Sequence, residues 1–416
     1  MELVHKDEVK PQPPAGAKRV PDPYRVLFPI GIAAALAGLL PWVLFAASQA
    51  PWWPAAVLPW WPGAEHAALM VQGFELSFIA GFLLTAMPAF THGARCTRAE
   101  LLVISALVAA FVVLRTLALP AAPFAYLAAL VALAFTVARR VRPGAAAPPE
   151  EFLLVGTGMA LGLAGAVVQV LVGLSVLPLS AERAGLRCVS LGMLPALVLG
   201  LGGLLVPTFA MMKSPLEIFG VARAGDRPRR RAFVLSIAAL LVIAVNLEFA
   251  GFGTPASWAR ALAALASTML AWKVWRLPGR RDRLSWALWT AGWCVALGFT
   301  AAALFPVFRV EAWHVAFVGG YTLLTLGIGT RVVVSHGGHA MSEERLLLSA
   351  TALVALALAA VVRVFGPPLD PAHATLQHML AATLACVAFV AWMAAAWPRV
   401  RRTRKTVLMP GSAKAR

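Results

Sequence analysis

Long apolar stretches recur along the whole chain, and they limit its fold more than any other feature. Each is about 18 to 25 residues long, enough to cross about 30 Å of hydrocarbon as an α-helix. The stretches show no alternation of apolar and polar residues, which argues against the strands of a membrane barrel. A helix also satisfies its own backbone hydrogen bonds, for which lipid offers no partners. The sequence therefore predicts an all-α, polytopic integral membrane protein.

The apolar stretches predict a transmembrane domain of about twelve helices over residues 26–397. We expect the spans at residues 26–47, 66–89, 100–119, 121–138, 151–175, 190–211, 231–251, 257–276, 284–305, 313–335, 344–364 and 374–397. Composition agrees, because 60% of the residues are hydrophobic and only 13% are charged. In soluble domains about a quarter of the residues are charged.

The distribution of lysine and arginine predicts the orientation, because positively charged loops stay in the cytoplasm during insertion. The tails, residues 1–25 and 398–416, are both basic, and basic residues recur after every second span. We therefore expect both tails in the cytoplasm, the first one disordered, with the tryptophan-rich connection 48–65 on the outer side. Because topology accounts for the net charge of +18, we expect membrane lipids and no nucleic acid as partners.

Seven of the eight histidines lie at predicted span ends, in two layers. The outer layer consists of His66, His314, His373 and His378, and the inner layer consists of His92, His336 and His339. Imidazole is a common ligand of heme iron, copper and zinc, so each layer is a candidate metal or cofactor site. The alternative is that these side chains are half-solvated at a membrane interface and bind nothing.

Two other polar residues fall inside predicted spans. Glu75 follows His66 by nine residues, which places it about 13 Å into the membrane. An acid at that depth is costly, and it is either a proton carrier, a partner of a buried cation, or a protonated group bonded to a neighbouring helix. Tyr321 follows His314 by seven residues, so the two share a helix face, where Tyr321 either packs or bonds a bound species.

Three stretches of the sequence resemble the NnrS family. HAALMVQGFELSFIAGFLLTAMPAFT at 66–91 is similar to the second span of that family, and GGLLVPTFAM at 202–211 is similar to another segment. WHVAFVGGYTLLTLGIGTRVVVSHGGH at 313–339 looks like a later block, in which His314, Arg331 and His336 match family positions. The chain departs from the pattern at Ala68 and Leu69, where the family has a second histidine and a glutamate.

The resemblance implies a protein of the bacterial inner membrane that binds heme and copper and is linked to nitric oxide metabolism. Nitric oxide is then a candidate small ligand of the heme iron, and a separate electron donor is a candidate partner. The leading hypothesis is therefore a heme-binding protein of the nitric oxide or denitrification stress response, with copper as a second candidate cofactor. Its ligands would come from the outer layer, with the inner layer as a second site.

Candidate residues for any chemistry are Glu75, Tyr321 and Arg331, and whether the protein turns over a substrate is left open. The competing hypothesis is a secondary transporter of twelve spans without a metal cofactor, which needs ionisable residues at the membrane midplane. A third is a subunit like that of the heme-copper oxidases, whose ligand histidines lie within the spans rather than at their ends.

Overall fold

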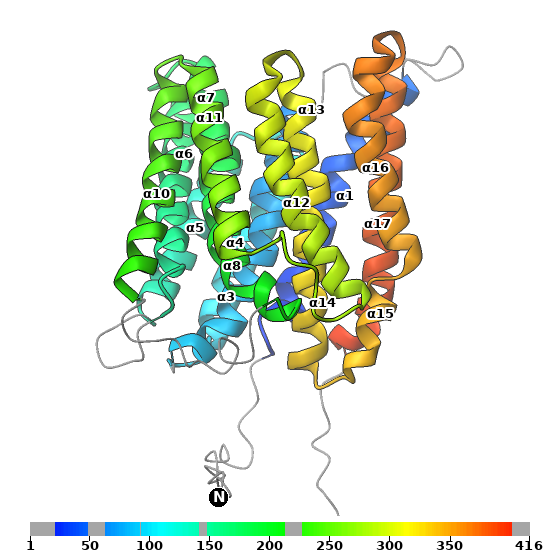
Figure 1. Cartoon of the computed structure of the whole chain (residues 1–416). Coiled ribbons are helices and arrows are strands. Elements are labelled where there is room, and N and C mark those ends of the chain that lie inside the picture. Colours follow the sequence, from blue (N-terminus) through cyan, green and yellow to red (C-terminus); the bar gives the residue numbers. More distant parts are fainter. Residues whose placement is uncertain (1–20, 49–62, 92, 141–147, 213–226, 402–416) are drawn as a thin grey trace, which may run out of the picture.

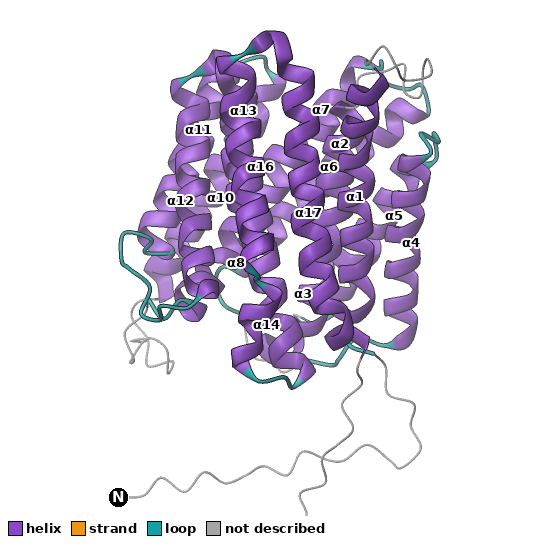
Figure 2. Cartoon of the chain, turned by 90° about the vertical axis from the view of Figure 1, so that its right-hand side faces the viewer, coloured by secondary structure: helices purple, strands orange, loops and turns teal. Residues whose placement is uncertain are grey.

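The computed structural model describes residues 21–48, 63–91, 93–140, 148–212 and 227–401. Within these residues every regular element is helical, and the long helices stand side by side in one bundle (Figures 1 and 2). Arg25 Nη1 donates to the carbonyl of Val400 at 2.6 Å, so the described chain starts and finishes at the same end of the bundle. We call this the terminal end and the opposite one the histidine end.

The helical segments follow one another along the chain, and four of them contain a π-helical turn, labelled η1, η2, η4 or η6. In order they are α1 (Tyr24–Ser48); α2 (Gly63–Ala68), η1 (Leu69–Glu75) and α3 (Leu76–Thr91); α4 (Arg98–Thr116); α5 (Ala122–Ala138); α6 (Phe152–Gly173); α7 (Ser180–Cys188), η2 (Val189–Met193) and α8 (Leu194–Phe209); α10 (Arg227–Phe249); α11 (Gly253–Ala266) and η4 (Ser267–Ala271); α12 (Arg283–Leu304); η5 (Pro306–Phe308), α13 (Arg309–His314), η6 (Val315–Thr322) and α14 (Leu323–Gly337); η7 (Met341–Glu343) and α15 (Glu344–Leu347); α16 (Ala350–Leu369); and η8 (Pro371–His373) and α17 (Ala374–Arg401).

Ten helices in the described part of the chain are long and apolar enough to cross a membrane, and α5 is a shorter apolar helix. This confirms the predicted all-helical fold and makes the chain a multi-pass membrane protein. The count of twelve and the side on which the termini lie stay predictions. Most of both predicted tails and most of the connection 48–65 lie outside the described residues.

Several predicted spans differ from the helices at their ends, and two of these differences have a clear local reason. The span expected at 257–276 lies on a helix that ends at Ala271, because Lys273 adopts a left-handed φ of 58°. The span expected at 344–364 begins too early, because α16 starts after Ser349, whose hydroxyl accepts a hydrogen bond from the Ala352 amide at 3.1 Å. Helix ends depend on single caps that hydropathy does not detect.

Three helical segments form the interior of the bundle: α2–η1–α3, α7–η2–α8 and α13–η6–α14. In their most apolar windows 89%, 89% and 67% of the residues are buried, compared with 22% to 56% in the other spanning helices. Each contains a π-helical turn, which is rare and is frequent at functional sites. The interior helices are therefore the first place to look for a site.

Helix α1 packs closely against η1 and α3 because small residues line the contact. A Cβ added to Gly73 would lie 2.8 Å from Ala34 Cβ, and one added to Gly81 would lie 2.8 Å from the ring of Phe28. The Phe28 ring stacks on Phe78 with centroids 4.3 Å apart. This contact holds the backbone of α1 against the first interior segment.

Arg140 connects α4 and α5 at the terminal end. Its guanidinium lies 2.7 Å from the Glu100 carboxylate, and its Nε donates to the Ala94 carbonyl at 2.9 Å. Glu100 also accepts from the Thr97 amide at 2.8 Å, in a capping box that starts α4. One buried arginine therefore holds a helix start, a loop and a helix end together.

We expect Arg140→Ala to destabilise the protein by about 2 kcal/mol, because charge-assisted hydrogen bonds are lost and Glu100 loses its partner. The apparent melting temperature in detergent measures this. The control is Arg98→Ala, since Arg98 is exposed on α4, the helix that carries Glu100. This substitution should cost at most about 0.5 kcal/mol. Equal losses of stability in the two variants would show that the contacts of Arg140 do not stabilise this end of the bundle.

Candidate functional site

Three of the four histidines of the predicted outer layer lie together at the histidine end. The ring of Trp42 stacks on His378 with centroids 4.8 Å apart and meets the His66 ring edge-on at 6.0 Å. His314 lies within electrostatic range of both His66 and His378. The structure thus brings together side chains from α1, α2, α13 and α17.

His66 and His314 share one hydrogen-bonding pattern. Nδ1 of His66 lies 3.0 Å from the carbonyl oxygen of Gly38, and Nδ1 of His314 lies 2.7 Å from that of Val310. A carbonyl oxygen only accepts, so each Nδ1 carries the hydrogen and each neutral ring keeps the Nε2 lone pair. Metal-ligating histidines are commonly oriented in this way.

The chain sets up these two hydrogen bonds differently. His314 bonds the carbonyl four residues earlier in α13. His66 bonds across to another helix, which requires α1 to approach closely at Gly38, where an added Cβ would lie 3.0 Å from Leu69 Cβ. One imidazole is therefore oriented by its own helix and the other by packing between helices.

Arg363, on α16, places a cation beside the histidines. It lies within electrostatic range of His66, His314 and His378. Its Nη1 is 3.6 Å from Glu311 Oε1, and among the described residues this nitrogen has no acceptor at hydrogen-bonding distance. The guanidinium can therefore bind an anionic group of a ligand. The sequence analysis did not select Arg363, although an arginine within a predicted span is by itself a candidate functional residue.

His373 lies apart from the other three. It belongs to the short turn η8, its side chain is 67% exposed, and its Nδ1 is 2.8 Å from Asp370 Oδ2. In the described part of the chain, no three His, Cys, Asp or Glu side chains are arranged to hold a metal ion. The clustered histidines therefore offer one or two ligands rather than a complete metal site.

The inner layer is more dispersed in the described residues. His336 is exposed at the end of α14, whereas His339 is half-buried with Nδ1 3.9 Å from Glu343 Oε1. Glu343 also receives a hydrogen bond from Arg399 Nε at 2.7 Å. Partial burial raises the pKa of the Glu343 carboxyl, but this arginine outweighs it and holds the pKa below its ordinary value. His92 lies outside the described residues.

Arg331, the third residue that matches the family block, lies near the terminal end. Its Nε is 3.0 Å from Glu344 Oε1, and its guanidinium lies over the Phe209 ring at 5.1 Å. These contacts connect α14 to α15 and α8. Its surroundings indicate a packing role.

Glu75 lies inside η1 and is only 4% exposed. Thr325 Oγ1, on the neighbouring interior segment, donates to Glu75 Oε2 at 2.7 Å. A small cavity of about 40 Å³ borders both residues, together with apolar side chains of α1, α3 and α8. That volume is enough for about one water molecule.

Tyr321 lies in another of the three interior π-helical turns, η6. Its buried hydroxyl has no hydrogen-bond partner among the described residues and lies within electrostatic range of Glu75. The Phe317 ring contacts both His314 and Tyr321, with centroids 6.1 Å and 5.6 Å away. The face shared by His314 and Tyr321 was predicted for a regular α-helix, whose spacing the π-helical turn alters.

Arg260 is a buried charge that the sequence analysis missed. It lies on α11, is 2% exposed, and its Nη1 is 2.5 Å from Glu248 Oε2. Its Nε donates to the Leu191 carbonyl within η2 at 3.0 Å. A carbonyl in a π-helical turn is thus satisfied by a side chain from another helix.

The fold and this site define a multi-pass helical membrane protein in which interior helices present oriented histidines at one end of the bundle. The chain belongs to the NnrS family, because the family model described as NnrS protein matches residues 20–404. This confirms the resemblance predicted from the sequence and links the protein to nitric oxide. No curated protein matches the chain.

We expect Thr325→Val to destabilise the protein by about 2 kcal/mol, because Glu75 loses its hydrogen bond in a buried position. The comparison is Thr300→Val, since the Thr300 hydroxyl bonds only a carbonyl of its own helix at 2.8 Å among the contacts described. Thermal unfolding in detergent measures both. A smaller loss of stability for Thr325→Val than for Thr300→Val would argue against the hydrogen bond between Thr325 and Glu75.

Proposed function

We propose that this protein binds heme at the histidine end and acts in the nitric oxide response of the bacterial inner membrane. The residues that would hold the heme iron are His66 and His314, through Nε2. The observation that carries the proposal is their shared hydrogen-bonding pattern, in which both Nδ1 atoms bond backbone carbonyls. Oriented imidazoles on neighbouring interior segments are suitable ligands for heme iron.

Heme fits the available ligands better than a bare ion. Its macrocycle supplies four nitrogen ligands, so the protein has to add only one or two. Arg363 can pair with a heme carboxylate through the Nη1 that lacks an acceptor at hydrogen-bonding distance. The Trp42 ring beside His66 and His378 provides an aromatic wall. No three His, Cys, Asp or Glu side chains of the described residues are arranged around one point for a bare ion, so we limit the proposal to heme.

We also propose twelve spans, with the terminal end in the cytoplasm. Arginines at the ends of α4, α5, α10 and α12 gather at the terminal end, which agrees with the rule that positive loops stay inside. The helical stretch Gly253–Ala271 and the shorter α5 supply the two spans beyond the ten that meet the length criterion. The heme site then faces the outer side of the membrane.

Each group has a separate task in this proposal. His66 and His314 would hold the heme through its iron, and Arg363 would pair with a heme carboxylate. When bound, heme would supply an iron at which nitric oxide can bind in place of one imidazole. Glu75 holds a proton deeper in the membrane, where Thr325 orients its carboxyl group. An electron donor on the outer side would be the partner.

A secondary transporter without a metal cofactor is the second candidate, favoured by the buried Glu75 and its cavity. The two candidates differ in which residue matters. Glu75→Gln should retain the heme absorbance of the wild type if the protein binds heme, whereas in a transporter it should abolish flux while His66→Ala has little effect.

Heme binding is tested by the Soret absorbance of detergent-purified variants from cells that supply heme. We expect His66→Ala and His314→Ala each to lower the heme bound per protein about tenfold or more, because each removes an imidazole that would hold the iron. The Soret band of the wild type should also shift on addition of nitric oxide.

His373→Ala is the matched control, since His373 is exposed and paired with Asp370 at the same end of the bundle. It should keep the heme content of the wild type. Size-exclusion chromatography shows whether each variant is folded. Folded His66→Ala and His314→Ala proteins that keep all their heme would refute the ligand assignment.

A further inference from the structure

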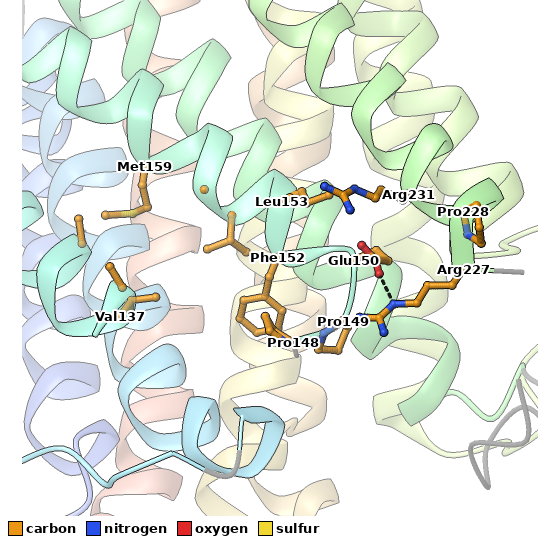
Figure 3. Close-up of a pocket in the computed structure, with 14 residues that line it drawn as sticks. Val137, Pro148, Pro149, Glu150, Phe152, Leu153, Met159, Arg227, Pro228 and Arg231 are labelled. Atoms are coloured by element: carbon orange, nitrogen blue, oxygen red, sulfur yellow. Dashed lines mark hydrogen bonds and ion pairs between the residues drawn. The ribbon is translucent and has the colours of Figure 1, made fainter. Parts of the chain in front are cut away.

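A groove of about 1000 Å³ opens at the terminal end between α5, α6 and α10 (Figure 3). Its walls are mostly apolar, with Val137 from α5 and Phe152, Gly156 and Met159 from α6. The same helix α5 carries Phe135, which is 61% exposed, on the surface that would face lipid. The groove therefore lies where a hydrocarbon chain can enter it.

The start of α10 gives one rim of the groove a positive charge. Arg227, Arg229, Arg230 and Arg231 are all exposed within its first turns. Glu150 pairs with Arg227 at 2.6 Å, and Glu151 pairs with Arg230. Four arginines against two glutamates leave a local charge of +2.

Arg231 has no recorded ion pair among the described residues and lines the groove with Arg227 (Figure 3). These two arginines are four residues apart, so on a helix they are neighbours of like charge and repel each other. Glu150 already pairs with Arg227, so the positive charge that is left over lies mainly on Arg231, where an anion at the rim would offset it. A negative headgroup therefore suits the rim, whereas the apolar walls suit an acyl chain.

We propose that this groove binds one anionic phospholipid, with an acyl chain along α6 and the phosphate against Arg231 and Arg227. Charge complementarity carries the choice, because a zwitterionic lipid supplies no net charge to a rim of +2. Basic pockets between helices on the cytoplasmic side bind anionic headgroups elsewhere in this way. The site is separate from the histidines and goes beyond the proposed function.

The test titrates the purified full-length protein with phosphatidylglycerol or with phosphatidylcholine of the same acyl chains and counts bound lipid by native mass spectrometry. We expect tighter binding of phosphatidylglycerol. We expect Arg231→Gln to weaken that binding about fivefold and to leave phosphatidylcholine unchanged. Arg98→Gln is the control, because Arg98 is an exposed arginine at the start of α4 outside the groove.

A second pair of variants tests the acyl chain. A Cβ at Gly156 meets no atom within 4 Å, so Gly156→Leu should fill the groove without a clash and lower lipid binding. Gly173→Leu adds the same volume to the same helix outside the groove, where an added Cβ has an ordinary contact with Phe124 at 3.6 Å. It should leave lipid binding unchanged.

Three results would overturn the proposal. The first is equal binding of the two lipids, and the second is equal weakening by Arg231→Gln and Arg98→Gln. The third is displacement of the bound lipid by inorganic phosphate at the same concentration, which would indicate a site for a free anion. Melting temperatures close to that of the wild type confirm that the variants are folded.

Discussion

The hydrogen bond from His66 to the Gly38 carbonyl is the interaction on which the candidate site most depends. It exists only because α1 packs against the first interior segment, and that contact in turn needs glycine at Gly38, Gly73 and Gly81. Packing in lipid relies on such close approach, since burial of apolar surface does not drive helices together there. The small residues of α1 and η1 thus determine both the bundle and the orientation of an imidazole.

The π-helical turns account for a second feature, which is the concentration of polar groups inside the bundle. Glu75 lies in η1 and Tyr321 in η6. A π-helical turn breaks the regular backbone ladder, and in lipid each interrupted group needs another partner. The bond from Arg260 to the Leu191 carbonyl in η2 is one such substitution. Polar side chains and irregular helix turns therefore occur together in the interior.

The sequence predicted the parts of this structure that depend on hydropathy and depth. The helices follow from long apolar stretches, and the grouping of His66, His314 and His378 follows from their similar depth at the starts of spans that run in the same direction. His373 shares that depth in the sequence, but η8 and its pairing with Asp370 place it at the surface. Depth alone does not distinguish the inside of a bundle from its edge.

Other features depend on contacts between distant segments and could not be predicted. The partner of Glu75 is Thr325, 250 residues further along the chain, and hydropathy offers no sign of that pairing. The same holds for Arg363 beside the histidines and for the π-helical turns, which have the composition of ordinary helix. Comparison of the segments 66–91, 202–211 and 313–339 with a family pattern found the right family, although it did not show how these segments meet.

The central claim is that His66 and His314 hold a heme between two interior segments. An experimental density map of the protein, purified from cells that supply heme, tests this most directly. The account predicts planar density for a macrocycle at the histidine end, with Nε2 of both His66 and His314 directed at its centre and Arg363 at its edge. A map of the ordered protein in which that region holds only side chains, or in which the macrocycle lies elsewhere, would contradict it.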